Sequence, residues 1–134
     1  MTQESTQQST QGSTQEGIDT ELVVARRFRG PARSGNGGYT AGALAQLAGW
    51  GTTTVRLSQP PQLDVAMTVT REPDLLVAAH DGAEVLRATP ATVEPTPVAP
   101  VDAETARAAE VGYPGLSAHP FPTCFSCGLS LIHI

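Results

Sequence analysis

The stretch of sequence that decides the fold is NGGYTAGALAQLA, residues 36–48. It lies inside a longer run, Ser34 to Val55, that contains no charged side chain. Alanine and leucine favour a helix over its second half. A helix that is apolar on every side has to be covered by protein or lipid, and crossing a bilayer takes about 20 residues. We therefore expect a short buried helix, entered through a glycine turn whose free N–H groups can hold a polar or anionic ligand group.

Composition limits the class of protein. The chain has 134 residues, a formal net charge of −5 and eight basic residues, all of them arginine. These arginines form no basic stripe, which gives nucleic-acid binding little support. There is no signal peptide and no transmembrane run, and two cysteines in C-x-x-C spacing indicate a reducing compartment. We expect a cytoplasmic protein without nucleic-acid or membrane partners.

Alternating apolar residues predict strands on both sides of the helix. Glu21 to Phe28 has a period of two and ends before Gly30-Pro31, which predicts the first strand. Further strands are predicted over 53–58 (with Val55 and Leu57 inward), 63–70, 75–80 and 83–88, the last two joined by an Asp81-Gly82 hairpin turn. An antiparallel sheet covers such a helix only if it curls around it, so the predicted class is α+β.

The chain divides into four predicted segments. Residues 1–18 form a polar tail without core-forming residues and are expected to be disordered. Residues 19–90 hold the helix and the strands. Residues 91–128 form a Pro-rich linker, a short helix with Asp102 as its N-cap, and a C-x-x-C loop. Residues 129–134, LSLIHI, look like a translated sequencing adapter and are expected to be a non-native end.

Four groups of residues together are similar to a known family. They are FRGP (28–31), NGGY (36–39), VRL (55–57) with PPQLD (60–64), and HPFPTCFSCG (119–128). From Leu22 to Gly128 the chain resembles the first half of a bacterial thioesterase-like family that carries two hotdog repeats per chain. The resemblance implies a hotdog fold, with a curled antiparallel sheet wrapped around one buried helix. Residues 19–90 would be the first repeat of a truncated chain, which should self-associate or need a second repeat.

The resemblance also implies that an acyl thioester lies at the start of the buried helix. Unpaired N–H groups and the helix dipole favour negative charge there, where oxygen charge develops during attack by water. Asn36, Gly37 and Gly38 are the candidates that polarise the carbonyl, and Gln46 is the candidate that orients water. Tyr39 and Trp50 are candidates for lining an acyl channel.

These candidates have structural alternatives. Asn-Gly-Gly also suits a tight strand-to-helix turn, and a buried Gln46 would have to bond a backbone group. Tyr39 and Trp50 would then simply pack. The helix has no Asp or Glu, so the general base that many hotdog hydrolases place there is missing, and Asp64 suits a turn or a strand edge.

Cys124 and Cys127 allow three interpretations: half of a structural zinc site with His119 as a third ligand, a redox pair, or small packed or partly exposed thiols. A closed zinc site needs four ligands and no second pair is present, so we expect thiols, without metal or cofactor. The predicted function is binding and hydrolysis of acyl-CoA or another acyl thioester. The alternatives are a non-catalytic acyl-CoA or acyl-carrier binding module and a small zinc-binding interaction domain.

Overall fold

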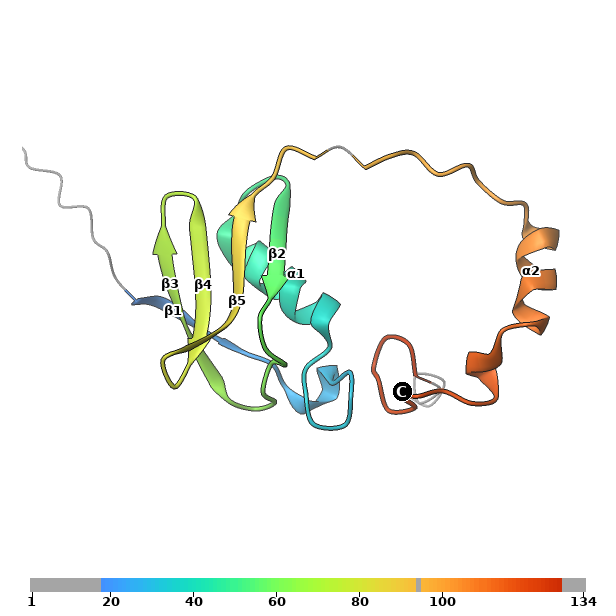
Figure 1. Ribbon diagram of the computed structural model, residues 1–134, viewed down its shortest axis with the longest axis horizontal. Coiled ribbons are helices and arrows are strands. Elements are labelled where there is room, and N and C mark those ends of the chain that lie inside the picture. Colours follow the sequence, from blue (N-terminus) through green and yellow to red (C-terminus); the bar gives the residue numbers. More distant parts are fainter. Residues whose placement is uncertain (1–17, 94, 129–134) are drawn as a thin grey trace, which may run out of the picture.

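The computed structural model describes residues 18–93 and 95–128, and these form an α+β fold (Figure 1). Five antiparallel strands make one sheet in the order β1-β3-β4-β5-β2, and helix α1 packs against it. The predicted class is therefore confirmed. Most of the predicted tail and all of the end 129–134 lie outside the described residues; Ile18, assigned to the tail, begins β1.

The elements follow the predicted order along the chain. The strands are β1 (Ile18–Val23), β2 (Thr53–Leu57), β3 (Ala66–Glu72), β4 (Leu75–His80) and β5 (Ala83–Pro90). The helices are α1 (Gly37–Ala48) and α2 (Ala103–Val111), with short 3₁₀ helices at Arg26–Phe28 and Pro114–Leu116. The hairpin between β4 and β5 turns at Asp81 and Gly82, whose φ angles of 50° and 75° are left-handed as a two-residue turn requires.

The first strand differs from its prediction. It ends at Val23, and the chain then bends into the 3₁₀ helix at Arg26–Phe28. A distant carboxylate explains the bend: Asp64 accepts the backbone N–H of Arg26 at 2.8 Å and its Nε at 3.0 Å. Asp64, with a φ of 59°, also delays the start of β3 to Ala66. Asp64 thus satisfies the backbone N–H of Arg26, which a neighbouring strand would otherwise do.

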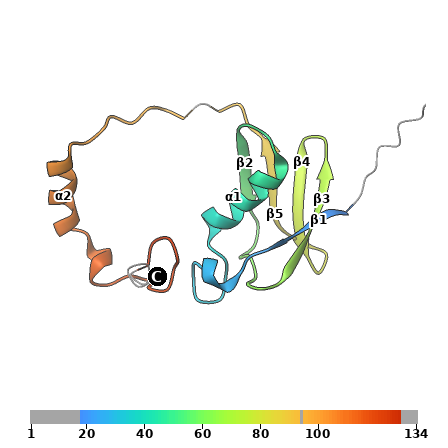
Figure 2. The same cartoon turned by 180° about the vertical axis from the view of Figure 1, so that it is seen from behind.

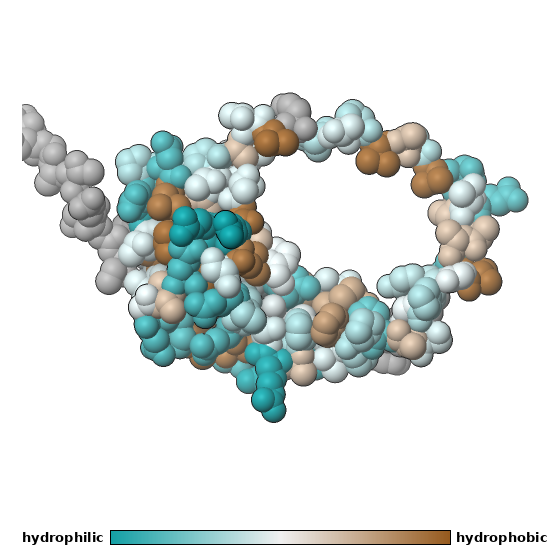
Figure 3. All heavy atoms as spheres, in the orientation of Figure 1, coloured by the Kyte–Doolittle hydropathy of each residue, from teal (hydrophilic) through white to brown (hydrophobic). Residues whose placement is uncertain are grey.

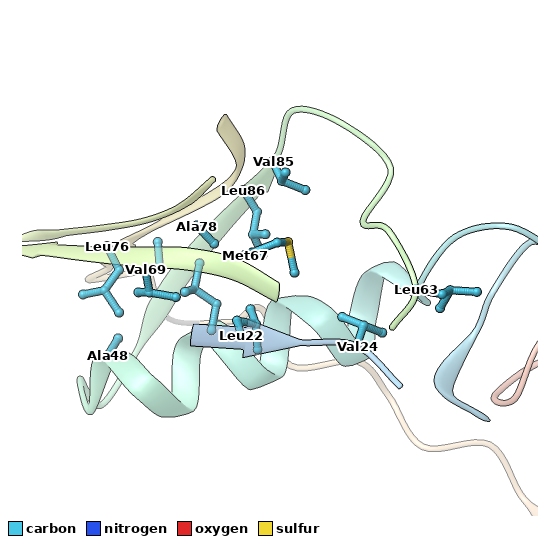
Figure 4. Close-up of a cluster of buried hydrophobic side chains, with 12 residues drawn as sticks. Leu22, Val24, Ala48, Leu63, Met67, Val69, Leu76, Ala78, Val85 and Leu86 are labelled. Atoms are coloured by element: carbon cyan, nitrogen blue, oxygen red, sulfur yellow. The ribbon is translucent and has the colours of Figure 1, made fainter. Parts of the chain in front are cut away.

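The core lies between the sheet and α1 (Figure 4). Only one face of α1 is buried, through Thr40, Leu44 and Ala48. Gly42 and Gln46 on other parts of the helix are exposed. The expectation of a helix buried on every side is therefore wrong for the described chain, because one sheet covers only one side of a helix.

Two strands show how register adjusts the core. A shift between β4 and β5 at Ala78 and Ala79 puts consecutive residues of β5, Val85 and Leu86, into the core. In β2, Val55 packs against the core as predicted. Leu57 was predicted to be inward, but it is 39% exposed, at the end of a strand that lies at the edge of the sheet.

The chain after β5 leaves the sheet and returns to the start of α1 (Figures 1 and 2). Residues 91–101 contain no regular structure where described, as predicted for a linker, although β5 extends to Pro90. Asp102 caps α2 as predicted, accepting the N–H of Thr105 at 2.8 Å. None of α2 is buried, so it has no packed face.

The segment from the linker to the end of α2, residues 91–111, exposes several apolar side chains. Brown spheres recur along it in Figure 3, in agreement with the exposed Val98, Val101 and Val111. The following loop, residues 119–128, comes back to lie against the start of α1. Among the described residues, no helix has the length and apolar character needed to cross a membrane.

Candidate functional site at the start of α1

The turn into α1 depends on Gly35. A Cβ there would lie 2.8 Å from Cγ1 of Val24 and 3.1 Å from Oγ1 of Thr40, so only glycine allows this approach. The N–H of Gly35 donates to the carbonyl of Pro61 at 2.8 Å. Gly35 was not among the predicted site residues, since its contacts come from segments distant in sequence.

Asn36 is the N-cap of α1. Its Oδ1 accepts the N–H of Tyr39 at 2.9 Å, and its carbonyl accepts the hydroxyl of Thr40 at 2.8 Å. The other side of the amide faces the C-x-x-C loop: Nδ2 donates to Oγ of Ser126 at 3.2 Å and to Sγ of Cys124 at 3.5 Å. Asn36 therefore joins the helix to the loop.

Gly37 and Gly38 form the first turn of α1. Neither has a left-handed φ, and a Cβ would find ordinary contact distances, 3.5 Å to Cδ2 of Leu57 at Gly37 and 3.4 Å to Oδ1 of Asn36 at Gly38. Their N–H groups have no acceptor among the described residues. The turn therefore does not require glycine at 37 and 38; it requires glycine at 35.

Tyr39 packs rather than opening a channel in this arrangement. Its ring stacks on Phe28 with 4.0 Å between centroids, and Phe125 meets it edge-on at 5.7 Å. Phe125 also meets Phe28 edge-on at 5.3 Å. This aromatic cluster fixes the C-x-x-C loop beside the helix start.

The remaining predicted residues lie elsewhere. Gln46 is exposed, so it does not bond a buried backbone group, and it lies about 12 Å along the helix from Gly38 at 1.5 Å per residue. Trp50 follows the C-terminus of α1 and packs partly buried against the core. The structure thus brings together Asn36, Gly37, Gly38 and Tyr39, but not Gln46 or Trp50.

Backbone bonds hold the C-x-x-C loop in place. The N–H of Phe125 donates to the carbonyl of Arg29 at 2.9 Å, and Nε of Arg29 donates to the carbonyl of Thr123 at 3.2 Å. The turn itself closes through the N–H of Gly128, which donates to the carbonyl of Cys124 at 2.9 Å. A Cβ on Gly128 would lie 2.7 Å from that carbonyl oxygen, so the turn requires glycine.

The two cysteines are free thiols with different surroundings. Cys124 is 2% exposed, whereas Cys127 is exposed, and Sγ of Cys127 donates to Sγ of Cys124 at 2.8 Å. Burial raises the pKa of Cys124, but this bond, the backbone N–H groups of Ser126 and Cys127 and the Asn36 amide outweigh it and lower the pKa to about 6. Sharing its proton with Cys124 raises the pKa of Cys127.

Among the described residues, no third His, Cys, Asp or Glu joins the two cysteines in a group suited to a metal ion. Nδ1 of His119, the residue predicted as a third ligand, instead accepts the N–H of Phe121 at 2.9 Å.

Comparison with known proteins gives no relative from which to transfer a function. No protein-family model matches the chain, and no curated protein or solved structure matches it. The site is therefore interpreted from its own geometry.

Proposed function

We propose that this protein binds an acyl thioester, such as acyl-CoA, with the thioester carbonyl at the start of α1, and hydrolyses it. The observation that carries the proposal is the pair Gly37 and Gly38. Their N–H groups have no acceptor among the described residues. The fold itself does not require glycine at these two positions, because each has room for a Cβ. Glycine at these positions allows a ligand carbonyl to approach the backbone closely.

The electrostatics of this helix end support the same ligand. The first turn of α1 contains no acidic residue, and the helix dipole adds partial positive charge at the N–H groups. Such donors stabilise the oxygen charge that develops when a thioester is attacked. The sulfur of Cys124 accepts from the Asn36 side chain instead, which leaves the N–H groups of Gly37 and Gly38 to the ligand.

An apolar surface lies next to these donors. Leu57 at the end of β2 is 39% exposed, with its Cδ2 3.5 Å from the position of a Cβ on Gly37. We assign this surface to the first part of the acyl chain. Tyr39 supports the helix start through Phe28 and Phe125 and is not assigned to the acyl channel.

The fold is compatible with this assignment. A five-stranded antiparallel sheet with one helix on it is compatible with a hotdog-like repeat, and we propose that the chain is such a repeat. In this proposal a second repeat or copy covers the exposed face of α1 around Gln46. The two free thiols agree with a cytoplasmic location.

A binding module without catalysis is the second candidate. It is favoured by the composition of α1, which contains no Asp or Glu. Gln46 lies about 12 Å from the proposed carbonyl site along its own helix, so it would reach only a thioester held by a facing repeat. Hydrolysis needs an activated water molecule, and binding does not.

The test compares Gly38→Ala with Gly42→Ala. Both add a methyl group to an exposed position of α1, but only Gly38 belongs to the proposed site. Calorimetric titration should show that Gly38→Ala weakens acyl-CoA binding by about tenfold, because the added methyl group keeps the ligand carbonyl from the backbone N–H and one hydrogen bond is lost. Gly42→Ala should bind acyl-CoA with the affinity of the parent protein. The affinity for free CoA should be the same in both variants and the parent protein.

Release of free CoA thiol from acyl-CoA then distinguishes the two candidates. Turnover that falls in Gly38→Ala supports the enzyme, whereas binding without turnover supports the binding module. Equal acyl-CoA affinity in both variants, or no binding by the parent protein, would refute the assignment of Gly37 and Gly38.

A further inference from the structure

The C-x-x-C loop has a chemistry of its own that the acyl-thioester site does not use. The loop contains both cysteines of the chain, so all thiol and disulfide chemistry of the protein takes place there. Its shape is fixed by Gly128, by the bond from Phe125 to Arg29 and by the aromatic cluster. Both sulfurs are thus held in one place by contacts to the helix-and-sheet unit.

The distance between the sulfurs is the decisive observation. Sγ of Cys127 lies 2.8 Å from Sγ of Cys124, and a disulfide needs these atoms to come about 0.8 Å closer. The two residues differ in exposure: Cys124 is buried and Cys127 is open to solvent. The pair therefore has one sulfur that a partner can reach and one that it cannot.

We propose that Cys124 and Cys127 form a redox-active dithiol, which exchanges with small disulfides and passes between two free thiols and an internal disulfide. The metal interpretation lacks further ligands in the described chain. The interpretation as inert packed thiols does not account for a shared S–H···S bond between a buried and an exposed cysteine. Asn36 and Ser126 add polar partners around the buried sulfur.

The exchange begins at the exposed sulfur. The Cys127 sulfur attacks one sulfur of a disulfide RSSR, the S–S bond breaks and RS⁻ leaves. The proton of Cys127 passes to the Cys124 thiolate across the existing bond. The product is a mixed disulfide between Cys127 and RS, beside a protonated Cys124.

The second step closes the internal disulfide. The RS⁻ released first takes the proton of Cys124 and becomes RSH, and the Cys124 thiolate attacks the Cys127 sulfur. The bond from Cys127 to RS breaks and a second RS⁻ leaves. Two electrons pass from the protein sulfurs to RSSR. In the reverse direction an external thiolate attacks Cys127, and Cys124 leaves as a thiolate that its hydrogen bonds stabilise.

The experiment uses oxidised and reduced glutathione as the probe. The full chain is equilibrated over a range of their ratios, quenched with acid, alkylated and analysed by mass spectrometry. The parent protein should lose two hydrogen atoms, carry no bound glutathione and give a peptide that links Cys124 to Cys127. Reduced glutathione should restore both thiols.

Single variants separate the two roles. Cys124→Ser should lose the internal disulfide and retain one glutathione on Cys127, because the buried partner that completes the exchange is missing. Cys127→Ser should remain largely unmodified, since its remaining thiol is buried. Thermal melts show whether each variant is folded, and peptide mapping of the parent protein tests the proposal even if a variant is not.

Three outcomes would overturn the proposal. The first is that both thiols stay reduced in excess oxidised glutathione. The second is a stable glutathione adduct on the parent protein without an internal disulfide. The third is zinc at one equivalent per chain that is lost in Cys124→Ser, which would make the loop a metal site completed by groups outside the described residues.

Discussion

The amide nitrogen of Asn36 lies 3.5 Å from the sulfur of Cys124, which is 88 residues further along the chain. The oxygen of the same amide caps α1 through the N–H of Tyr39 at 2.9 Å. One side chain therefore stabilises the helix start and the buried thiol together. Substitutions at Asn36 should affect helix stability and thiol chemistry separately, according to which half of the amide they keep.

Asn36→Asp and Asn36→Ala test this dual role. Asp keeps an oxygen that can cap α1 but loses the N–H donor and adds a negative charge near Cys124. At pH values below about 6, where Cys124 is protonated, we expect its unfolding free energy to stay close to that of the parent protein, while the pKa of Cys124 rises. Ala loses both functions and should lower the unfolding free energy by about 1 kcal/mol. Denaturant titrations and thiolate absorbance measure the two effects; equal thiol pKa values in Asn36→Asp and the parent would contradict the assignment.

The protonation of Cys124 should make stability depend on pH. Its pKa is about 6 in the folded protein and 9.0 for an unperturbed thiol. A lowered pKa stabilises the folded state above the unperturbed value, so this contribution is complete above pH 9.0 and is lost as the pH falls through about 6. The raised pKa of Cys127 acts in the opposite direction, mainly above pH 9.0.

The measurement is a set of urea titrations across this pH window. Cys124→Ala removes the group and is the matched control below pH 9.0. Above that pH it also removes the contact that raises the pKa of Cys127. We expect the difference in unfolding free energy between parent and variant to grow with rising pH. A difference that is constant across the window would show that Cys124 has no lowered pKa.

Gly35→Ala should be among the most destabilising single methyl additions in the chain. Its Cβ would overlap Cγ1 of Val24 at 2.8 Å, and Val24 is fully buried. Overpacking of this kind costs about 1–3 kcal/mol. Gly42→Ala is the control: nothing lies within 4 Å of its added Cβ, so helix propensity should stabilise it by up to about 1 kcal/mol. Thermal melts that rank the two variants in the opposite order would refute this account of the turn.

The chain should self-associate, since in the part that the structure describes β2 is an edge strand and one face of α1 is uncovered. Leu57→Lys adds a charge at that edge and should lower the average mass measured by light scattering. Val101→Lys makes a similar change in the extended segment, where Val101 is 72% exposed, and should have no effect. A parent protein that is monomeric and melts cooperatively would contradict this prediction.

Local patterns in the sequence predicted much of the fold. Alternating apolar residues identified the strands from β2 to β5. Asp81-Gly82 identified the hairpin between β4 and β5, and Asp102 identified the N-cap of α2. These features depend on residues within one or two turns of each other, so the sequence contains all the information needed. Asn36 and the helix that begins at Gly37 belong to the same class.

The sequence-based expectations that the structure corrects depend on partners distant in the chain. The end of β1 is set by Asp64, and the burial of Gln46 and Leu57 is set by what covers them. Arg71 shows the same limit: its guanidinium donates to the carbonyls of Leu47 and Ala48 at the end of α1, which no local pattern indicates.

The sequence by itself determined that an uncharged helix follows a glycine turn among antiparallel strands. Helix propensity, period and turn chemistry are properties of neighbouring residues, and they are enough for that. Only the tertiary structure decided that Gly35 rather than Gly37 or Gly38 is required by the turn, and that the C-x-x-C loop lies on Asn36. Those relationships arise from close contacts between segments that the sheet and the returning chain bring together, and spacing along the sequence does not encode them.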